Sequence, residues 1–193
     1  MNLYVRGILL VSVMASTAVF AEAYTSRYAG EEQRTIKSLS ADDIATLERG
    51  GGWGLAKAAE LNGVPGPLHI LQMADEIRLT SPQHGKIAAL YDKMKTQAIP
   101  LGKALIRLEV SLNAQFSDGT LSAGTLQQLL QEIEAVRADL RYVHLAAHLE
   151  TPAILTPEQI RHYNQLRGYG NDPCQHVPKG HNPEMWKRHH GCG

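Results

Sequence analysis

Two apolar stripes with helical spacing constrain the fold of this 193-residue chain more than any other feature. In the first stripe the spacing alternates between four and three, over Ile87, Tyr91, Met94, Ala98, Leu101, Leu105, Leu108 and Leu112. The second repeats the pattern over Leu126, Leu129, Ile133, Val136, Leu140, Val143 and Ala147. Such a stripe lies on one side of a helix and is buried when two helices pack lengthwise. The pattern therefore predicts two long helices, over residues 82–116 and 123–150.

The short segment between these helices, which contains Asp118-Gly119, indicates an antiparallel hairpin. At a rise of 1.5 Å per residue, the hairpin is expected to be roughly 50 Å long. Pro100 lies inside the first helix and should kink it near Thr96, because the proline ring displaces the carbonyl four residues back. The expected fold class is all-α, a long antiparallel hairpin with short flanking helices. A single hairpin leaves apolar surface uncovered, so the flanking helices and a second copy in a homodimer are the expected cover.

The flanking segments carry weaker patterns. Residues 24–39 lack an apolar period and predict a flexible lead, whereas Ser40 and the acids after it predict a helix from 40 to about 49. The glycines at 50–52 should end that helix. A turn or two is expected at 53–61, and further helices at 68–78 and 157–167. The chain thus divides into a segment 1–23, a lead 24–65, a hairpin domain 66–167 and a tail 168–193.

The first 23 residues resemble an export signal. Arg6 precedes an apolar run over residues 7–20, and Ala21 and Ala23 provide a small-residue cleavage site. A retained membrane anchor is the alternative, but the run is short of the roughly 20 apolar residues that span a bilayer. The predicted location is the periplasm. With Lys plus Arg 19 and Asp plus Glu 19, the net charge is zero, which gives no electrostatic basis for nucleic-acid binding.

The tail concentrates soft and borderline metal ligands: Cys174, His176, His181, Met185, His189, His190 and Cys192. Imidazole and thiolate suit Zn, Ni and Cu, so a transition metal ion is the expected ligand of a tail that orders around it. Two alternatives remain open here. The cysteines could instead form one disulfide with incidental histidines nearby, and the histidines could derive from a purification tag.

A second candidate metal site lies on the second long helix. His144 and His148 are four residues apart, so they project from the same side of that helix, on the flank of the stripe. Symmetric pairing across the turn places His148 near Tyr91 and Asp92, which makes Asp92 a candidate third ligand. Weaker candidates are Glu60, His69 and His84. The alternative is that the two histidines are ordinary flank residues.

No catalytic constellation is present in the sequence. It lacks G-x-S-x-G, H-E-x-x-H and a glycine loop followed by a helix-opening lysine. Cys174 and Cys192 lie where no neighbouring base is held in place, so nucleophilic catalysis is not expected. The protein is predicted not to be an enzyme.

Two copies of one pentad, L-T-x-x-Q, stand at residues 79–83 and 155–159, one at each end of the predicted hairpin. In each copy Thr can cap a helix and Gln can reach back to the cap, as in a capping box. In this setting the pentads resemble the LTxxQ-motif periplasmic family, which includes Spy/CpxP-type chaperones and related zinc-resistance and heavy-metal sensor proteins. The resemblance covers roughly residues 66–167 and implies a helical hairpin, often dimerised into a cradle. It also implies either client capture or metal sensing, with sensor ligands on the helix before the second pentad.

The predicted function is metal binding in the periplasm, for heavy-metal resistance or for sensing metal or envelope stress. The alternative is an ATP-independent holdase chaperone of the Spy/CpxP type. A third reading is a structural subunit of an envelope protein. The expected partners are a second copy, unfolded envelope proteins, or a membrane sensor or anti-sigma partner.

Overall fold

The computed structural model describes residues 24–169, 177–189 and 191–192, and within these ranges it is helical with no β-strand. The chain divides into two units, residues 1–33 and residues 34–193. In the described part of the first unit, a 3-10 turn spans Glu31–Gln33 and the Arg27 guanidinium lies 5.4 Å from the ring centre of Tyr28. Every feature below belongs to the second unit.

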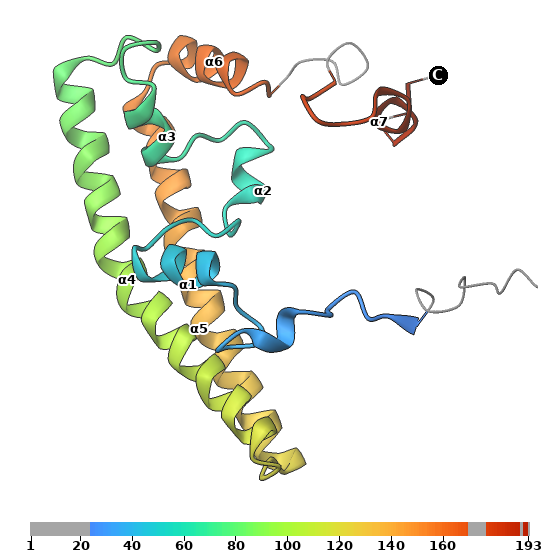
Figure 1. Ribbon diagram of the computed structural model, residues 1–193. Coiled ribbons are helices and arrows are strands. Elements are labelled where there is room, and N and C mark those ends of the chain that lie inside the picture. Colours follow the sequence, from blue (N-terminus) through green and yellow to red (C-terminus); the bar gives the residue numbers. More distant parts are fainter. Residues whose placement is uncertain (1–23, 170–176, 190, 193) are drawn as a thin grey trace, which may run out of the picture. The chain divides into compact units, whose positions relative to one another are not determined.

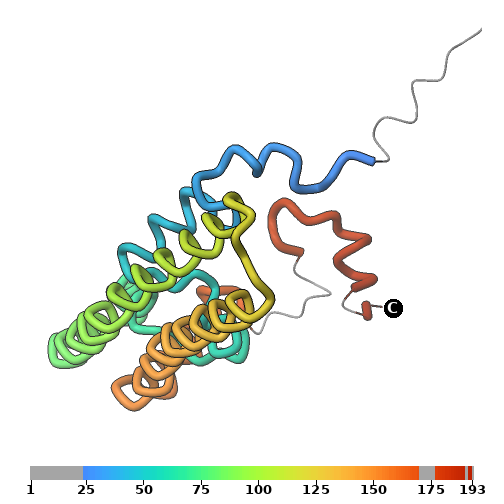
Figure 2. The backbone as a smooth tube through the Cα atoms, turned by 90° about the horizontal axis from the view of Figure 1, so that it is seen from below, coloured from blue at the N-terminus to red at the C-terminus, as the bar shows by residue number. Residues whose placement is uncertain are grey.

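The hairpin consists of α4 (Ser81–Ser117) and α5 (Ala123–Glu150), which run side by side in Figures 1 and 2. Leu105 and Leu140, taken from the two apolar stripes, are 0% and 1% exposed. The predicted hairpin and its buried seam are therefore confirmed. α4 continues through Pro100, and Figure 1 shows its axis changing direction in the middle of the helix.

Helix α1 (Ala41–Glu48) packs against α4. It begins with a capping box, in which Ser40 accepts from the backbone N–H of Asp43 and the Asp43 carboxylate accepts from that of Ser40. Its last turn lies so close to α4 at Gly102 that a Cβ at that position would overlap the carbonyl of Leu47. Glycine at position 102 is thus what allows α1 to cover the hairpin.

The segment that leads into α1 is also part of the core. Ile36 and Leu39 are 4% and 2% exposed and pack in the same cluster as Leu105 and Leu140. The expectation of a flexible lead is wrong for this end of residues 24–39. Two apolar residues three positions apart are too few to show a period, so the sequence pattern did not predict that they are buried.

Between α1 and α4 the chain forms two short helices, α2 (Lys57–Glu60) and α3 (Pro67–Gln72). α2 is the expected turn within 53–61, whereas α3 is shorter than the predicted helix at 68–78. Gly50 and Trp53 take positive φ angles of 67° and 43°, which turn the glycine-rich segment away from the helical path. Arg78 (φ 53°) makes a similar reversal immediately before the first pentad.

The second pentad follows a 3-10 turn, η3 (Thr151–Ile154), and opens α6 (Pro157–Leu166). Thr80 and Thr156 each form the predicted capping box, with Gln83 and Gln159 respectively. Beyond α6, the described part of the tail contains α7 (Pro183–His189), a helix that the sequence analysis did not predict. The start of α7 is capped by the residue just before it, since the Asn182 side chain accepts from the backbone N–H groups of Glu184 and Met185.

No helix within the described ranges combines the length and the apolar character needed to cross a membrane. The proposed export segment, residues 1–23, lies outside those ranges.

Candidate functional site

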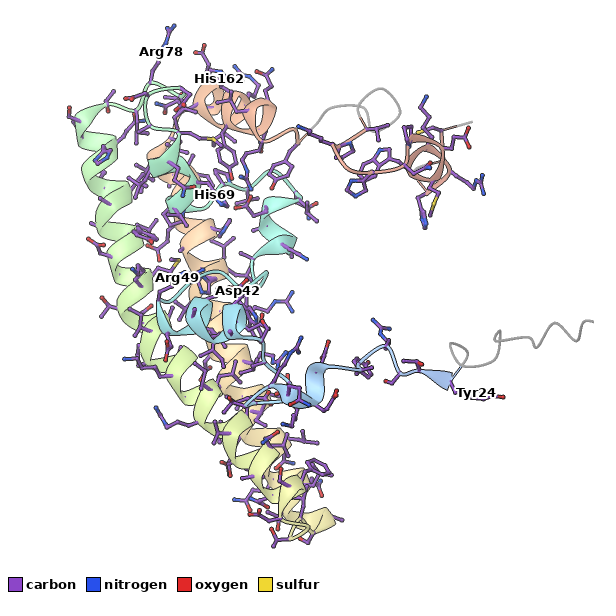
Figure 3. The ribbon with its side chains drawn as sticks, viewed as in Figure 1. Tyr24, Asp42, Arg49, His69, Arg78 and His162 are labelled. Atoms are coloured by element: carbon purple, nitrogen blue, oxygen red, sulfur yellow. The ribbon has the colours of Figure 1, made fainter. Side chains whose placement is uncertain are left out.

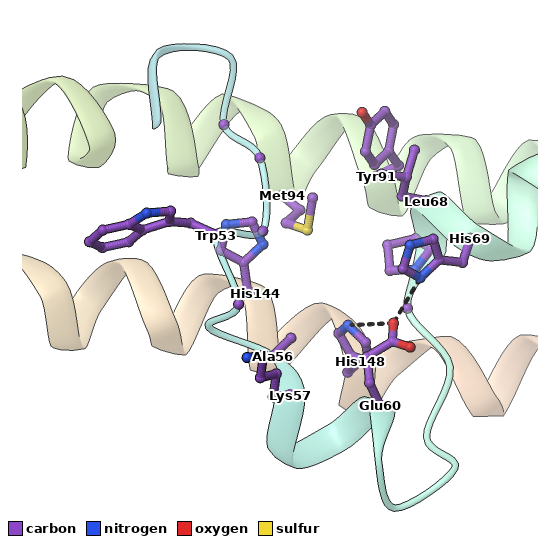
Figure 4. Close-up of a pocket in the computed structure, with 16 residues that line it drawn as sticks. Trp53, Ala56, Lys57, Glu60, Leu68, His69, Tyr91, Met94, His144 and His148 are labelled. Atoms are coloured by element: carbon purple, nitrogen blue, oxygen red, sulfur yellow. Dashed lines mark hydrogen bonds and ion pairs between the residues drawn. The ribbon is translucent and has the colours of Figure 1, made fainter. Parts of the chain in front are cut away.

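A cavity of about 220 Å³ lies where the glycine-rich segment, α2 and the start of α3 face α4 and α5 (Figure 4). The side chains that can carry chemistry there are Trp53, Glu60, His69, Tyr91, Met94, His144 and His148. They come from five separate stretches of the chain. The pocket exists because the short α2 and α3 segments fold back over the hairpin.

His144 is almost fully buried, at 3% exposure. Its Nε2 is buried without a hydrogen-bond partner. Burial, together with the charge of His148, lowers the pKa of His144 below its usual range and outweighs the backbone of Gly51, which favours the charged ring, so the imidazole is neutral at pH 7. A neutral imidazole has one ring nitrogen with a free lone pair, which can bind a metal ion.

His148, one turn further along α5, is also buried. Its exposure is 6%, and its Nδ1 lies 2.9 Å from the carbonyl oxygen of Val64. A carbonyl only accepts, so Nδ1 donates, and the lone pair of the neutral form of this ring is on Nε2. That Nε2 lies 3.9 Å from Oε1 of Glu60. Histidines that bind metal ions commonly donate their other ring N–H to a backbone carbonyl, which fixes the orientation of the ring.

Glu60, the last residue of α2, supplies a carboxylate to the pocket (Figure 4). Its Oε1 is 2.8 Å from Nδ1 of His69, a residue that Figure 3 labels on α3. Burial raises the pKa of the Glu60 carboxyl, but hydrogen bonds from His69 and Tyr169 and the charges of His69 and Arg167 outweigh it. The pKa falls to about 2, so the pocket contains a fixed negative charge.

Several sequence-predicted ligands meet in this pocket and others do not. His144 and His148 lie together, and the weaker candidates Glu60 and His69 join them. The sequence placed the two histidines on the flank of the stripe, where burial is not required, and the structure buries both of them beneath the Gly51 and Val64 segments. Asp92 is exposed on α4 and does not line the pocket, while its neighbour Tyr91 does. His84 is exposed in the first turn of α4.

The tail candidates separate into described and undescribed residues. His181, Met185 and His189 are exposed, and the His181 ring meets that of Trp186 edge-on at 4.9 Å. Cys192 is in a disulfide, so its sulfur is not a thiolate in this state. The other cysteine of the sequence, Cys174, lies outside the described residues, as do His176 and His190.

The donor set of the pocket fits a transition metal ion, although the side chains are not yet arranged around one point. In the described part of the chain, no three His, Cys, Asp or Glu side chains stand close enough to share an ion as they are. The Nε2 of His144 is nevertheless a buried nitrogen without a hydrogen-bond partner, and it faces the pocket residues that could share an ion with it. Zn–N and Zn–O bonds are about 2.0–2.2 Å, so two tetrahedral ligand atoms lie about 3.4 Å apart, and the 3.9 Å between His148 Nε2 and Glu60 Oε1 would have to shorten by about 0.5 Å around an ion.

The fold and the site together define a small helical-hairpin protein with one capping box at the start of α4 and a second at the start of α6, and with buried imidazoles beside a carboxylate. The family model described as LTXXQ motif family protein matches residues 67–167, and the chain belongs to this family, as the pentads indicated. Members are typically periplasmic and generally non-enzymatic. No curated protein and no solved structure matches the chain.

Proposed function

We propose that this protein binds a transition metal ion in the periplasm, through His144, His148 and Glu60, and serves heavy-metal resistance or the sensing of metal stress. The observation that carries the proposal is the buried Nε2 of His144, which has no hydrogen-bond partner. A buried polar atom left unsatisfied destabilises a fold by about 1–3 kcal/mol, and a metal–nitrogen bond would remove that penalty. Imidazole and carboxylate donors suit Zn, Ni and Cu.

Each residue has a separate part in this proposal. His144 supplies a buried Nε2 without a hydrogen-bond partner, and the ring of His148 is held by the carbonyl of Val64. Glu60 provides the negative charge that offsets part of the charge of a dication. His69 is hydrogen-bonded to Glu60 and becomes a fourth donor if that bond opens. The exposed tail residues His181, Met185 and His189 would form a separate surface site.

Trp53 allows the interior site to be tested in the full chain. It lines the same pocket as His144, and the sequence has one other tryptophan, Trp186 in the tail. In a Trp186→Phe background, Ni²⁺ or Cu²⁺ bound in the pocket should quench the Trp53 fluorescence at a stoichiometry of about one. His144→Ala and His148→Ala should abolish the saturable quenching, whereas His162→Ala, at an exposed position on α6, should not. Equal quenching in all variants would contradict an interior site.

A holdase chaperone is the second candidate function. Tyr142 and Leu149 are 72% and 77% exposed and lie seven residues apart, hence on one face of α5. An exposed apolar face of this kind is suited to unfolded clients. Suppression of the aggregation of a denatured test protein by the metal-free chain, reduced in a Tyr142→Ser, Leu149→Ser variant, would favour this function over metal sensing.

A further inference from the structure

The two oxygens of the Glu60 carboxylate have different partners. Oε1 faces the histidine pocket, and Oε2 contacts residues at the C-terminal end of the hairpin domain. We infer that Tyr163, Arg167 and Tyr169 are positioning residues for the metal site, and that a bound metal ion in turn tightens residues 163–169, from which the tail continues. The inference rests on the proposed function and concerns how the same site is regulated.

The contacts at the second oxygen are specific. Oε2 of Glu60 accepts from the hydroxyl groups of Tyr163 at 3.2 Å and Tyr169 at 3.0 Å, and Nη2 of Arg167 lies 3.5 Å away. Nη2 of Arg167 also donates to the Tyr169 hydroxyl at 3.1 Å, and the guanidinium lies 5.5 Å from the centre of that ring. Tyr163 is 0% exposed. Oε2 is thereby held by the C-terminal part of the domain, which leaves Oε1 turned toward His69 and His148.

A second connection runs through the loop between α2 and α3. The carbonyl of Gly63 accepts from Nδ2 of Asn164 on α6, and the next carbonyl, that of Val64, accepts from His148 on α5. The same loop passes so close to His148 that a Cβ at Gly66 would overlap its Nε2. The ring of His148 and the helix that carries Tyr163 are therefore fixed to adjacent peptide groups.

The coupling between the metal site and residues 163–169 follows because one carboxylate, that of Glu60, contacts both. Outer-shell partners that orient a ligating carboxylate typically change metal affinity by about 10–100-fold when removed. Binding free energies are reciprocal, so whatever Tyr169 and Tyr163 add to metal affinity, the metal ion adds to the stability of their contacts. Metal occupancy would then be communicated to the segment that joins the domain to its His/Cys-rich tail.

Phenylalanine substitutions test this relationship, since they remove only the hydroxyl groups. In the full chain with Trp186→Phe, Tyr169→Phe and Tyr163→Phe should weaken Ni²⁺ binding, followed by Trp53 quenching, about 10-fold or more. Tyr142→Phe, at a 72% exposed position on α5, is the matched control and should bind Ni²⁺ like the parent. The visible absorption bands of bound Co²⁺ should also change in Tyr169→Phe, because they report the ligand geometry, which a purely structural role would leave unaltered.

Hydrogen exchange tests the reciprocal effect. In the parent, saturating Ni²⁺ should slow amide exchange in peptides that cover residues 163–169, and Glu60→Gln should remove this slowing. Parent-like Ni²⁺ affinity and Co²⁺ spectrum in both phenylalanine variants, or exchange at 163–169 that Ni²⁺ does not alter, would overturn the inference. If His144→Ala abolishes quenching while Tyr169→Phe behaves like the parent, only the coupling fails. If His144→Ala leaves quenching intact, the proposed function fails with it.

Discussion

The side-chain amides of Gln83 and Gln159 donate hydrogen bonds to each other, from Nε2 of Gln83 to Oε1 of Gln159 at 2.8 Å and in return at 3.0 Å. Each oxygen also accepts from the backbone N–H of its own cap residue, Thr80 or Thr156. Each amide nitrogen also donates to a backbone carbonyl, that of Ile154 or Arg78. The two pentads therefore have a shared structural role, in which each glutamine completes its own capping box and also joins that box to the other.

Replacing Gln83 by glutamate should separate capping from pairing. Glutamate is a good capping-box residue, but its carboxylate has no N–H to donate to Gln159 or to Ile154. We expect Gln83→Glu to lower the free energy of unfolding by about 1–3 kcal/mol, measured by urea denaturation. Gln165→Glu, at an exposed position on α6, is the control and should change stability by less than about 0.5 kcal/mol. If both variants unfold at the same urea concentration, the pairing is energetically unimportant.

Gly66→Ala should obstruct the metal site without unfolding the protein. Gly66 has φ −101° and ψ 156°, which alanine also adopts, but the added Cβ would overlap Nε2 of His148. We expect a loss of at least 10-fold in Ni²⁺ affinity by Trp53 quenching, with the helical circular dichroism spectrum unchanged. Gly85→Ala, where a Cβ meets nothing within 4 Å, is the matched substitution and should bind Ni²⁺ normally.

Gly102→Ala should lower the stability of the protein without altering the proposed metal ligands, which is the reverse of the effect expected for Gly66→Ala. The added Cβ meets the backbone of Leu47, which cannot move aside as a side chain could. Overpacking of this kind destabilises by about 1–3 kcal/mol, so a clear drop in the thermal midpoint is expected. Gly124→Ala, near the start of α5, has space for the methyl group and should be neutral or slightly stabilising.

Acid stability should depend on Glu60. Its pKa falls from 4.5 to about 2 in the folded state, so its ionised form stabilises the fold above pH 4.5 and this contribution is lost as the pH falls toward 2. In metal-free buffer we expect Glu60→Gln to unfold more easily than the parent by about 2 kcal/mol at pH 7, allowing for solvent screening. The difference should shrink steadily between pH 5 and pH 2. The exposed control Glu76→Gln should show a smaller difference at pH 7, and a pH-independent gap for Glu60→Gln would contradict the assignment.

The hairpin could be predicted from the sequence because the apolar residues that it buries recur at a regular helical spacing. Two stripes and a short turn between them were enough to place Leu105 and Leu140 in the core. The stripes did not indicate which neighbouring residues would also be buried. Glu109, off the stripe, is 6% exposed, with one carboxylate oxygen accepting from the Ser38 hydroxyl at 2.7 Å and the other 3.6 Å from Arg137. That environment depends on the segment before α1, which carries no period.

The pocket could be predicted only in part, for the same reason. The spacing of His144 and His148 placed them on one side of a helix, and that much follows from helical geometry. Their burial depends on the glycine-rich segment and on the α2–α3 loop, whose paths are set by positive φ angles and by contacts distant in sequence. Glu60 was a weak candidate because no local motif links it to His148, 88 positions later in the numbering. Asp92 was favoured by symmetric pairing across the turn, but the pairing brought Tyr91 to the pocket instead.

The paired glutamines are separated by 76 residues, whereas the two helices meet within a few residues at the turn between Ser117 and Ala123. Loop-closure entropy makes the contacts nearest the turn the easiest to form and those at the pentads the hardest. The hairpin is thus expected to form first at the turn and then to extend toward the pentads, with α6 docking last. A folding chain would pass through a stage in which the two helices are aligned but the hydrogen bonds between Gln83 and Gln159 have not yet formed.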